Sequence, residues 1–475
     1  MNFETEAAGR GAPLPGFVTL KHEVTLSDLP VRGRIPGWLN GTLIRNGPGA
    51  FEAGTQPVNH WFDGLAMLHR FGIRDGRVSY ANRYLLTDAY KSAKDSGALA
   101  TLEFGTNPGW GLPRRLWSMF KTPLTDNANV NVAELGGTHV ALTEARSPIV
   151  FDADTLRTVG KGRAAPGAFA SAHPLYDAGR GELVNLAVSV GPKSWYRLFA
   201  DRADGSRRPL AALETRSISY MHSFAMTDRY VVLTEFPLVV DPLKLALIPL
   251  TNKPYIKNFV WKPERGTRFT VVDRNDGSLV QRARTDSFFS FHHINAFEQD
   301  GDVVMDLCCS NDGGQAVRDL YLDRLRASCE VGDVQTRRYR MSVATGQMRV
   351  EQVGQYLELP RFNERQFAFK PYQFAYGIGR AQSDRSLGDR IRKVDVASAT
   401  ATDWIAPGSS VGEPIFVGAP DGDSEDEGVL LTVVLDGKKG RSLLAVLDAR
   451  SMSETARVEL PHCVPLGFHG QFYPR

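Results

Sequence analysis

The chain has 475 residues, of which 42% are hydrophobic, 10% aromatic and 23% charged, values typical of a globular protein with a sizeable core. Its 56 Lys and Arg residues against 53 Asp and Glu leave a net charge of +3, and the basic residues form no long block. These values exclude a disordered, collagen-like or small disulfide-stapled chain, and they argue against nucleic acid as a partner.

Signals for export or membrane anchoring are missing from the places where they would be expected. The N-terminal stretch MNFETEAAGRGAPLPGF has no positive n-region or apolar h-region, and four cysteines suit a reducing compartment. The most apolar run, residues 238–250, contains Asp241, Lys244 and two prolines, and a spanning helix needs roughly 20 apolar residues. We therefore expect a cytoplasmic protein without a signal peptide or transmembrane helix, in which residues 1–15 form a flexible tail.

Short segments rich in β-branched and aromatic residues recur along the chain and predict β-strands. The clearest of them are residues 78–87, 138–144, 230–236, 302–309 and 429–435. Turn residues predict hairpins between such segments, because Gly and Asn tolerate a positive φ; these turns are Asp75-Gly76, Asn275-Asp276-Gly277 and Thr345-Gly346. One short helix is predicted within residues 318–329.

The even spread of 45 Gly and 27 Pro leaves no linker between two halves, which predicts a single domain over residues 1–475. The many short strands predict an all-β fold. We favour a propeller over tandem sandwiches, because propeller blades leave only short, protected sheet edges.

Four of the ten histidines lie where a predicted strand starts or where a turn meets one: His173, His222, His292 and His469. They are far apart in sequence, so they can converge only if the fold brings distant segments to a common axis. Three glutamates lie in apolar or proline-flanked stretches: Glu144, Glu358 and Glu413. A buried carboxylate needs a partner, and the N–H of a metal-bound imidazole is a common one. Each of these residues alone also has an ordinary interpretation as a core or surface position.

Ordered motifs along nearly the whole chain resemble those of the carotenoid cleavage oxygenases, iron(II) enzymes that cut conjugated double bonds with dioxygen. These motifs are RNGPGAFE (45–52), HWFDGLAMLHRF (60–71), TDNANVNV (125–132), LTE (142–144), AHP, MHSFAMTDRYVV, FHHINAFE, LELPRFN, KPYQFAYG, EPIFV and GFHG. The resemblance implies a seven-bladed β-propeller with a helical and loop-built dome over the axial face that holds the metal.

The resemblance also implies a site in which one Fe²⁺ per chain is held by His173, His222, His292 and His469, with Glu144, Glu358 and Glu413 accepting hydrogen bonds from the ligands. The family pattern F-H-x-x-N selects His292 over its neighbour His293. The expected substrate tunnel is lined by Phe62, Phe104, Thr143, Phe291 and Phe472. No catalytic side chain is implied beyond the metal centre.

The implied activity is dioxygenase cleavage of one conjugated C=C bond of a carotenoid or apocarotenoid, with O₂ as co-substrate and two carbonyl products. The motifs are most similar to the branch that holds the animal carotenoid oxygenases and the retinoid isomerohydrolase. An isomerohydrolase-like or stilbenoid-cleaving activity is the alternative within the family, although Thr143 stands where stilbene cleavers carry a lysine. Outside the family, the alternatives are a non-catalytic polyene-binding propeller and a zinc hydrolase.

A water-insoluble substrate implies contact with a membrane. Two segments, residues 112–121 and 238–261, interleave apolar side chains with Arg and Lys, as interfacial segments do. We therefore expect peripheral association with membrane lipid.

Overall fold

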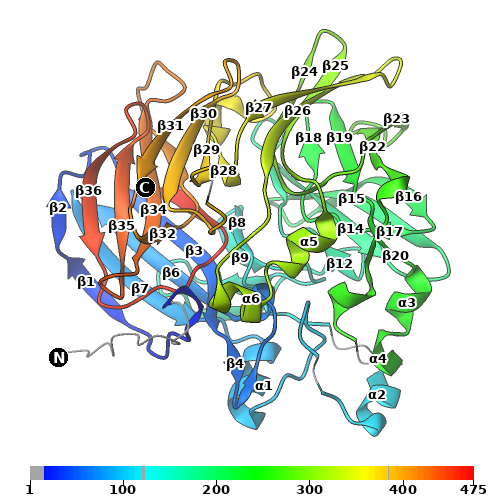
Figure 1. Ribbon diagram of the computed structural model, residues 1–475, viewed down its shortest axis with the longest axis horizontal. Coiled ribbons are helices and arrows are strands. Elements are labelled where there is room, and N and C mark those ends of the chain that lie inside the picture. The colour runs from blue at the N-terminus through cyan, green and yellow to red at the C-terminus, as the bar shows by residue number, and fades with distance from the viewer. Residues whose placement is uncertain (1–14, 108, 119–123, 252, 383) are drawn as a thin grey trace.

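The computed structural model describes residues 15–107, 109–118, 124–251, 253–382 and 384–475. Of the expected tail at residues 1–15, residues 1–14 lie outside the described residues, and Pro15 begins the short 3₁₀ helix η1 (Pro15–Phe17). Strands dominate the described chain, and the helices labelled α1 to α6 lie in the middle and lower part of Figure 1. The expectation of a mostly β protein is confirmed.

Seven sheets of four to six strands make up most of the described chain, and all their strand pairs are antiparallel. The first sheet consists, in order of pairing, of β1 (Thr25–Leu29), β7 (Arg77–Tyr84), β6 (Leu65–Arg74), β3 (Gly41–Ala50) and β37 (Gly470–Pro474). The second consists of β11 (Thr158–Lys161), β10 (Ile149–Phe151), β9 (Thr138–Leu142) and β8 (Asn131–Leu135). The third consists of β12 (Phe169–Ala170), β14 (Glu182–Ser189), β15 (Ser194–Arg202) and β16 (Arg207–Thr215), and β13 (Leu175–Asp177) also pairs with β14.

The next three sheets each have four antiparallel strands that pair in chain order. They are β18 (Ala225–Met226), β19 (Tyr230–Glu235), β22 (Thr267–Asp273) and β23 (Leu279–Thr285); β24 (Phe289–Gln299), β25 (Asp302–Ser310), β26 (Gln335–Ser342) and β27 (Met348–Gly354); and β28 (Glu358–Arg361), β29 (Phe374–Gly379), β30 (Arg390–Asp395) and β31 (Thr400–Ile405). The seventh is β2 (Val31–Gly33), β36 (Ser453–Glu459), β35 (Arg441–Asp448), β34 (Gly428–Asp436) and β32 (Ser409–Val411), with β33 (Ile415–Gly418) on β34. Smaller sheets are formed by β17 (Ile218–Ser219), β20 (Leu238–Val240) and β21 (Val260–Trp261), and by β4 (Glu52–Ala53) and β5 (Gln56–Pro57).

The two ends of the described chain exchange strands between the first and the last of these sheets. Strand β37, near the C-terminus, pairs with β3 in the first sheet, with Leu43 opposite Phe472. Strand β2, near the N-terminus, pairs with β36 in the last sheet, with Arg32 opposite Arg457. Backbone hydrogen bonds therefore tie the sequence-distant ends together, and these contacts cover edges that would otherwise be open.

Turn chemistry forms the hairpins where the sequence predicts them. Asp75 and Gly76, between β6 and β7, have φ values of 50° and 75°. Gly277, between β22 and β23, and Gly346, between β26 and β27, have φ values of 75° and 73°, which glycine adopts without the Cβ clash of other residues.

The helices are short and gather beside the sheets rather than within them (Figure 1). They are α1 (Asp88–Ser96), α2 (Leu112–Ser118), α3 (Pro242–Ala246), α4 (Ile248–Thr251), α5 (Gly313–Arg318), α6 (Leu322–Ala327) and α7 (Glu364–Phe367), with 3₁₀ helices η2 (Trp61–Asp63), η3 (Tyr255–Asn258) and η4 (Pro263–Arg265). The helix predicted within residues 318–329 is α6. Among the residues that the structure places, no helix is long and apolar enough to cross a membrane.

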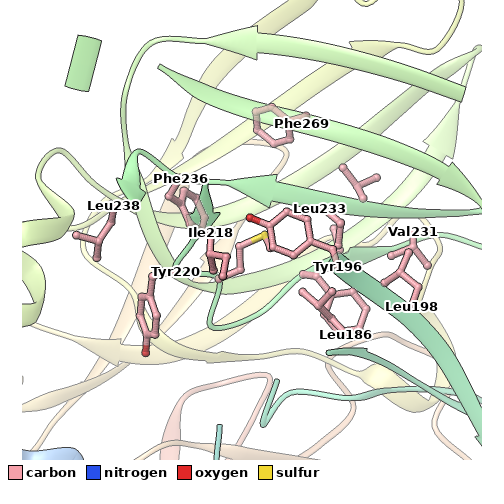
Figure 2. Close-up of a cluster of buried hydrophobic side chains, with 14 of the residues drawn as sticks. Leu186, Tyr196, Leu198, Ile218, Tyr220, Val231, Leu233, Phe236, Leu238 and Phe269 are labelled. Carbon is pink, nitrogen blue, oxygen red and sulfur yellow. The ribbon is translucent and has the colours of Figure 1, made fainter. Parts of the chain in front are cut away.

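The largest core cluster fills the space between neighbouring sheets. Figure 2 shows side chains from β14, β15, β17, β19, β20 and β22 packed together, among them Tyr196, Leu233 and Phe269. Tyr220 lies at the edge of this cluster, with its hydroxyl pointing away from the other labelled side chains. The apolar burial thus fixes the positions of the segments from which the polar residues described next project.

Candidate metal centre

Four histidines from four separate parts of the chain converge on one point: His173, His222, His292 and His469. They lie between β12 and β13, between β17 and β18, within β24, and directly before β37, respectively. One nitrogen of each imidazole lies within 4.8 Å of the corresponding nitrogens of the other three. The sequence prediction that these four come together is therefore matched by the geometry.

The facing nitrogens are close enough to share one ion. His173 Nε2 lies 2.9 Å from His222 Nε2, and His292 Nε2 lies 3.2 Å from His469 Nε2. Nitrogens bound at about 2.1 Å in adjacent positions around a metal are separated by about 3 Å. Burial, followed by the nearby imidazoles, lowers the pKa of His173 and of His469 well below the usual histidine range, so both rings are neutral.

Three of the imidazoles donate a hydrogen bond from their other ring nitrogen to a glutamate. His222 Nδ1 lies 2.5 Å from Glu144 Oε1, and His292 Nδ1 lies 2.7 Å from Glu358 Oε2. His469 Nδ1 lies 2.8 Å from Glu413 Oε1. These hydrogen bonds place the proton on Nδ1 and leave the Nε2 lone pair facing the other histidines. The lone pairs would repel one another, so the arrangement favours a cation between them.

Glu413 lies in a buried ionic network that the sequence prediction missed. Its carboxylate accepts hydrogen bonds from Arg45 and, at 2.9 Å, from Arg361 Nε, and also from the backbone N–H of Gly470. The Glu413 side chain is 1% exposed and that of Arg45 is 7% exposed. Arg45 lies in the motif RNGPGAFE and Arg361 in the motif LELPRFN. A charged residue inside a largely apolar motif is the sequence signal that could have identified them as partners of a buried carboxylate.

Glu144 has a second partner, Tyr220, which the sequence prediction also missed. The Tyr220 hydroxyl donates to Glu144 Oε1 at 3.0 Å, and burial, followed by the nearby Glu144 charge, raises the pKa of Tyr220 well above the usual tyrosine range. The phenol therefore remains a neutral donor that helps to hold Glu144 against His222. No local sequence signal marks Tyr220, because its partner is 76 residues away.

His293 points away from the four-histidine cluster. Its Nδ1 lies 2.8 Å from Ser223 Oγ and its Nε2 lies 2.8 Å from Thr234 Oγ1, so both ring nitrogens have hydroxyl partners. The neighbouring side chains of β24 thus point to different partners, and His292 rather than His293 joins the cluster.

Two cavities meet beside the histidines. The first has a volume of about 120 Å³ and is bordered by His222, His292 and His469. The second has a volume of about 50 Å³ and is bordered by His222 and Glu144. Phe62 and Val130 line both, so the two cavities adjoin at the candidate metal centre.

Four of the five predicted tunnel residues line these cavities. Phe62 and Phe291 border the first cavity, and Phe62, Phe104 and Thr143 border the second. The rings of Phe62 and Phe104 are 5.1 Å apart, and Phe62 stacks on His222 with ring centroids 6.1 Å apart. These aromatic faces form an apolar wall directly beside the imidazoles.

Phe472 is placed differently from the prediction. It packs in the core cluster of Leu43 and Phe71, and it is not among the residues that border either cavity. Its place beside the histidines is taken by Phe468, which borders the first cavity and lies 5.2 Å from Phe62 between ring centroids. Phe472 lies within β37, where it pairs with Leu43 of β3, and its side chain packs into the core cluster of the first and last sheets rather than beside the histidines.

The chemistry of the donor set fits a transition metal. Four imidazole nitrogens suit iron, zinc, copper or nickel, whereas magnesium and calcium prefer oxygen ligands. The three glutamates bonded to the imidazoles supply negative charge that offsets the doubly positive ion. The described residues of this centre could therefore hold a divalent metal ion.

Comparison with known proteins gives one consistent family. The family model described as "Retinal pigment epithelial membrane protein" (RPE65) matches residues 17–474. The carotenoid-cleaving dioxygenase, mitochondrial, of Macaca fascicularis is 33% identical, over 98% of this chain and 95% of its own. The carotenoid isomerooxygenase of Galleria mellonella is 31% identical, over 94% of this chain and 93% of its own.

Solved structures agree with these sequence relatives. The crystal structure of cobalt-substituted Synechocystis ACO has a TM-score of 0.87 and 28% sequence identity, and the match covers 97% of this chain and 98% of that one. The family model alone spans almost the whole sequence. Together with the four-histidine cluster, these findings show that the chain belongs to the RPE65/carotenoid cleavage oxygenase family.

Proposed function

We propose that this protein is a non-haem iron(II) dioxygenase that cleaves one conjugated C=C bond of a carotenoid or apocarotenoid. The C=C bond breaks and one atom of dioxygen ends on each carbon, so two carbonyl products form without another oxidant. The observation that carries the proposal is the cluster of four imidazoles, three of them bonded to glutamates, at the junction of two cavities. The relatives named as carotenoid-cleaving enzymes support the reaction class.

The residues of this chain would hold the metal and position the polyene. His173, His222, His292 and His469 would ligate iron(II), which when bound supplies the activation of dioxygen that redox-inert zinc does not. Glu144, Glu358 and Glu413 keep the Nδ1 protons in place, so that the Nε2 lone pairs stay directed at the ion. No acid or base side chain is required by this reaction.

The cavity walls would select the bond that is cut. Phe62, Phe104 and Phe291 present flat apolar faces beside the imidazoles and can hold a rigid polyene by shape, in one position relative to the metal. The same walls keep water away from the reacting carbons. Thr143 completes this side of the second cavity.

For the architecture, we propose that the seven sheets are the blades of a seven-bladed β-propeller, with the helices and loops as a dome, in one domain over residues 1–475. The support is the sheet inventory and the exchange of β2 and β37 between the first and last sheets, a pairing of chain ends that would close a ring of blades. Imidazoles contributed by different blades would then meet on the axis.

Metal exchange tests the proposed cofactor. Removal of bound metal with a chelator is expected to abolish cleavage of a polyene in detergent, and anaerobic reloading with Fe²⁺ is expected to restore it. Zinc suits the same imidazole ligands, so it should bind at one per chain and give no cleavage. Metal analysis together with product chromatography measures both effects. Full cleavage by the zinc-loaded protein would contradict the proposed chemistry.

For substrate supply, we propose that the protein is cytoplasmic and docks on a membrane through an exposed apolar patch. The patch consists of Leu112, Leu116 and Trp117 of α2 with Leu243 and Leu247 at α3, whose side chains are between 46% and 69% exposed. Helix α4 packs against both α2 and α3, so the two parts of the patch belong to one surface, at the lower right of Figure 1. Exposed Lys244 adds positive charge. Residues 119–121 of the predicted interfacial segment lie outside the described residues.

Charge placed in the patch is expected to weaken membrane binding. The double variant Trp117→Glu/Leu243→Glu removes two exposed apolar side chains, whose burial in lipid contributes about 1.5–3 kcal/mol each, so binding to phosphatidylserine-containing vesicles should fall at least tenfold. Vesicle co-sedimentation measures the bound fraction. Val350→Glu on β27, at the opposite end of the molecule in Figure 1, is the matched control and should bind like the parent. Equal binding by all three proteins would rule out the patch as the docking surface.

A further inference from the structure

The two cavities beside the metal centre differ in the chemistry of their walls. Apart from the metal-centre residues, two serines and Tyr356, the first cavity is enclosed by apolar side chains such as Trp61, Leu320 and Ile378. Half of the residues that border the smaller second cavity are polar, among them Glu103, Thr125, Thr143 and Tyr255. A symmetric hydrocarbon has no polar end group that could contact the polar side chains of the second cavity.

Several of the polar groups in the second cavity are already engaged with the protein. Asn127 uses its amide on the backbone of Ala66 and Gly64, and Glu144 is held by His222 and Tyr220. Among the described residues, by contrast, no hydrogen bond involves the hydroxyl of Thr143. Glu103 accepts hydrogen bonds from the hydroxyls of Thr101, at 2.5 Å, and of Thr125, and its carboxyl group retains further hydrogen-bonding capacity.

Glu103 is also buried, with 2% of its surface exposed, and it has no ion-pair partner among the described residues. Two further acids among these residues, Asp63 and Asp126, act on its carboxyl group. Burial, followed by the charge of Asp63, raises the pKa of Glu103 to about 8, while hydrogen bonds from Thr101 and Thr125 act in the opposite direction. At pH 7 the side chain is therefore a neutral carboxylic acid, which can donate a hydrogen bond as well as accept one.

We infer that Glu103 is a specificity-determining residue that binds a terminal oxygen of the substrate, assisted by the Thr143 hydroxyl. The enzyme would take an apocarotenoid with a carbonyl or hydroxyl end in the second cavity and its hydrocarbon end in the first. Because the two cavities are unequal, about 120 Å³ and 50 Å³, the cleaved bond would lie off the centre of the polyene. This inference rests on the proposed function and adds to it the substrate class and the orientation.

The test compares three ligands with the same polyene length: an apocarotenal, the corresponding alcohol, and a hydrocarbon that lacks the terminal oxygen. Dissociation constants are measured anaerobically on the iron-loaded protein by quenching of tryptophan fluorescence, so no turnover is needed. The parent protein is expected to bind the aldehyde about tenfold more tightly than the hydrocarbon, because a buried polar group left without its partner is unfavourable. Glu103→Leu should reduce this ratio to about one, whereas Glu103→Gln, which keeps a donor and an acceptor, should retain it.

Phe169→Leu is the matched control, because Phe169 borders the same cavity without a polar group. It should change the affinity for all three ligands by the same factor. An unchanged ratio in Glu103→Leu, or a parent protein without preference for the oxygenated ligands, would overturn the inference.

A pH profile of the parent protein is a second test, and it does not depend on whether the Glu103→Leu variant folds. As the pH rises through about 8, Glu103 loses its proton and with it the ability to donate to a carbonyl, so the aldehyde should bind more weakly. The alcohol can donate to the carboxylate and should bind as before, and Glu103→Gln should show no such pH dependence. Identical pH profiles for aldehyde and alcohol would contradict the role of Glu103.

A parallel turnover assay separates this inference from the proposed function. If all three ligands were cleaved but the expected affinity ratio were absent, the inferred role of Glu103 would be wrong and the proposed dioxygenase activity would stand. The expected ratio without any cleavage would support Glu103 as a binding residue and count against the dioxygenase.

Discussion

Replacement of His292 with alanine is expected to abolish stoichiometric metal binding and to lower turnover at least about hundredfold. His292 Nε2 lies 3.2 Å from His469 Nε2, and its Nδ1 is held by Glu358, so its loss removes one proposed ligand and leaves that carboxylate without its imidazole partner. Metal analysis of the protein purified without oxygen, followed by reloading with Fe²⁺ and a cleavage assay, measures both effects.

The neighbouring histidine provides the control. His293→Ala changes the same residue type on the same strand, but His293 bonds to Ser223 and Thr234 rather than to the cluster. We expect it to lower the free energy of unfolding by about 1–3 kcal/mol, because Thr234 loses its imidazole partner and Ser223 keeps only the carbonyl of Phe291, and to retain one metal ion per chain. If His292→Ala retained full metal content, or if His293→Ala lost its metal to the same degree, the proposed ligand set would be wrong.

Replacement of Glu413 with glutamine is expected to be the most destabilising change among the three glutamates. Glutamine can still accept a hydrogen bond from His469, but it leaves Arg45 and Arg361 without their shared anionic partner. The loss of one partner from a buried ion pair lowers the free energy of unfolding by about 3–5 kcal/mol. Urea denaturation of the metal-free proteins measures this loss separately from any effect on metal affinity.

Glu144→Gln is the matched comparison, because Glu144 contacts a histidine and a tyrosine and has no arginine partner among the described residues. Its side chain is 19% exposed, so we expect a loss of about 1 kcal/mol. Both variants should weaken metal binding by about ten- to hundredfold, since both glutamates orient a proposed ligand. Equal unfolding free energies for the two variants would contradict the importance of the arginine pair.

Much of the fold could be predicted because its signals are local. The strand segments such as residues 230–236 and 429–435 are recognisable from their β-branched residues, and β19 and β34 lie there. The turns at Gly277 and Gly346 need a positive φ, and the glycines at these positions predict such turns. The pairing of β37 with β3 joins residues more than 400 positions apart, and no local pattern encodes such a contact.

The candidate site divides in the same way. The histidines could be named because ordered motifs surround them, and the family pattern F-H-x-x-N selected His292 over His293. Arg45 and Arg361 were missed because their role depends on Glu413, which lies 368 and 52 positions away from them. Phe472 was selected for its nearness to His469 in sequence, but its side chain packs with Leu43 and Phe71 in a core cluster, a long-range contact that no local pattern encodes.

The most direct test of the proposed function follows the fate of dioxygen in one turnover. The iron-loaded protein is incubated briefly with an apocarotenal under ¹⁸O₂, and the products are reduced at once to alcohols so that carbonyl oxygen cannot exchange with water. The proposed dioxygenase predicts one labelled oxygen at the newly formed end of each of the two products. Label on only one product, or unlabelled products whose oxygen comes from water, would contradict it.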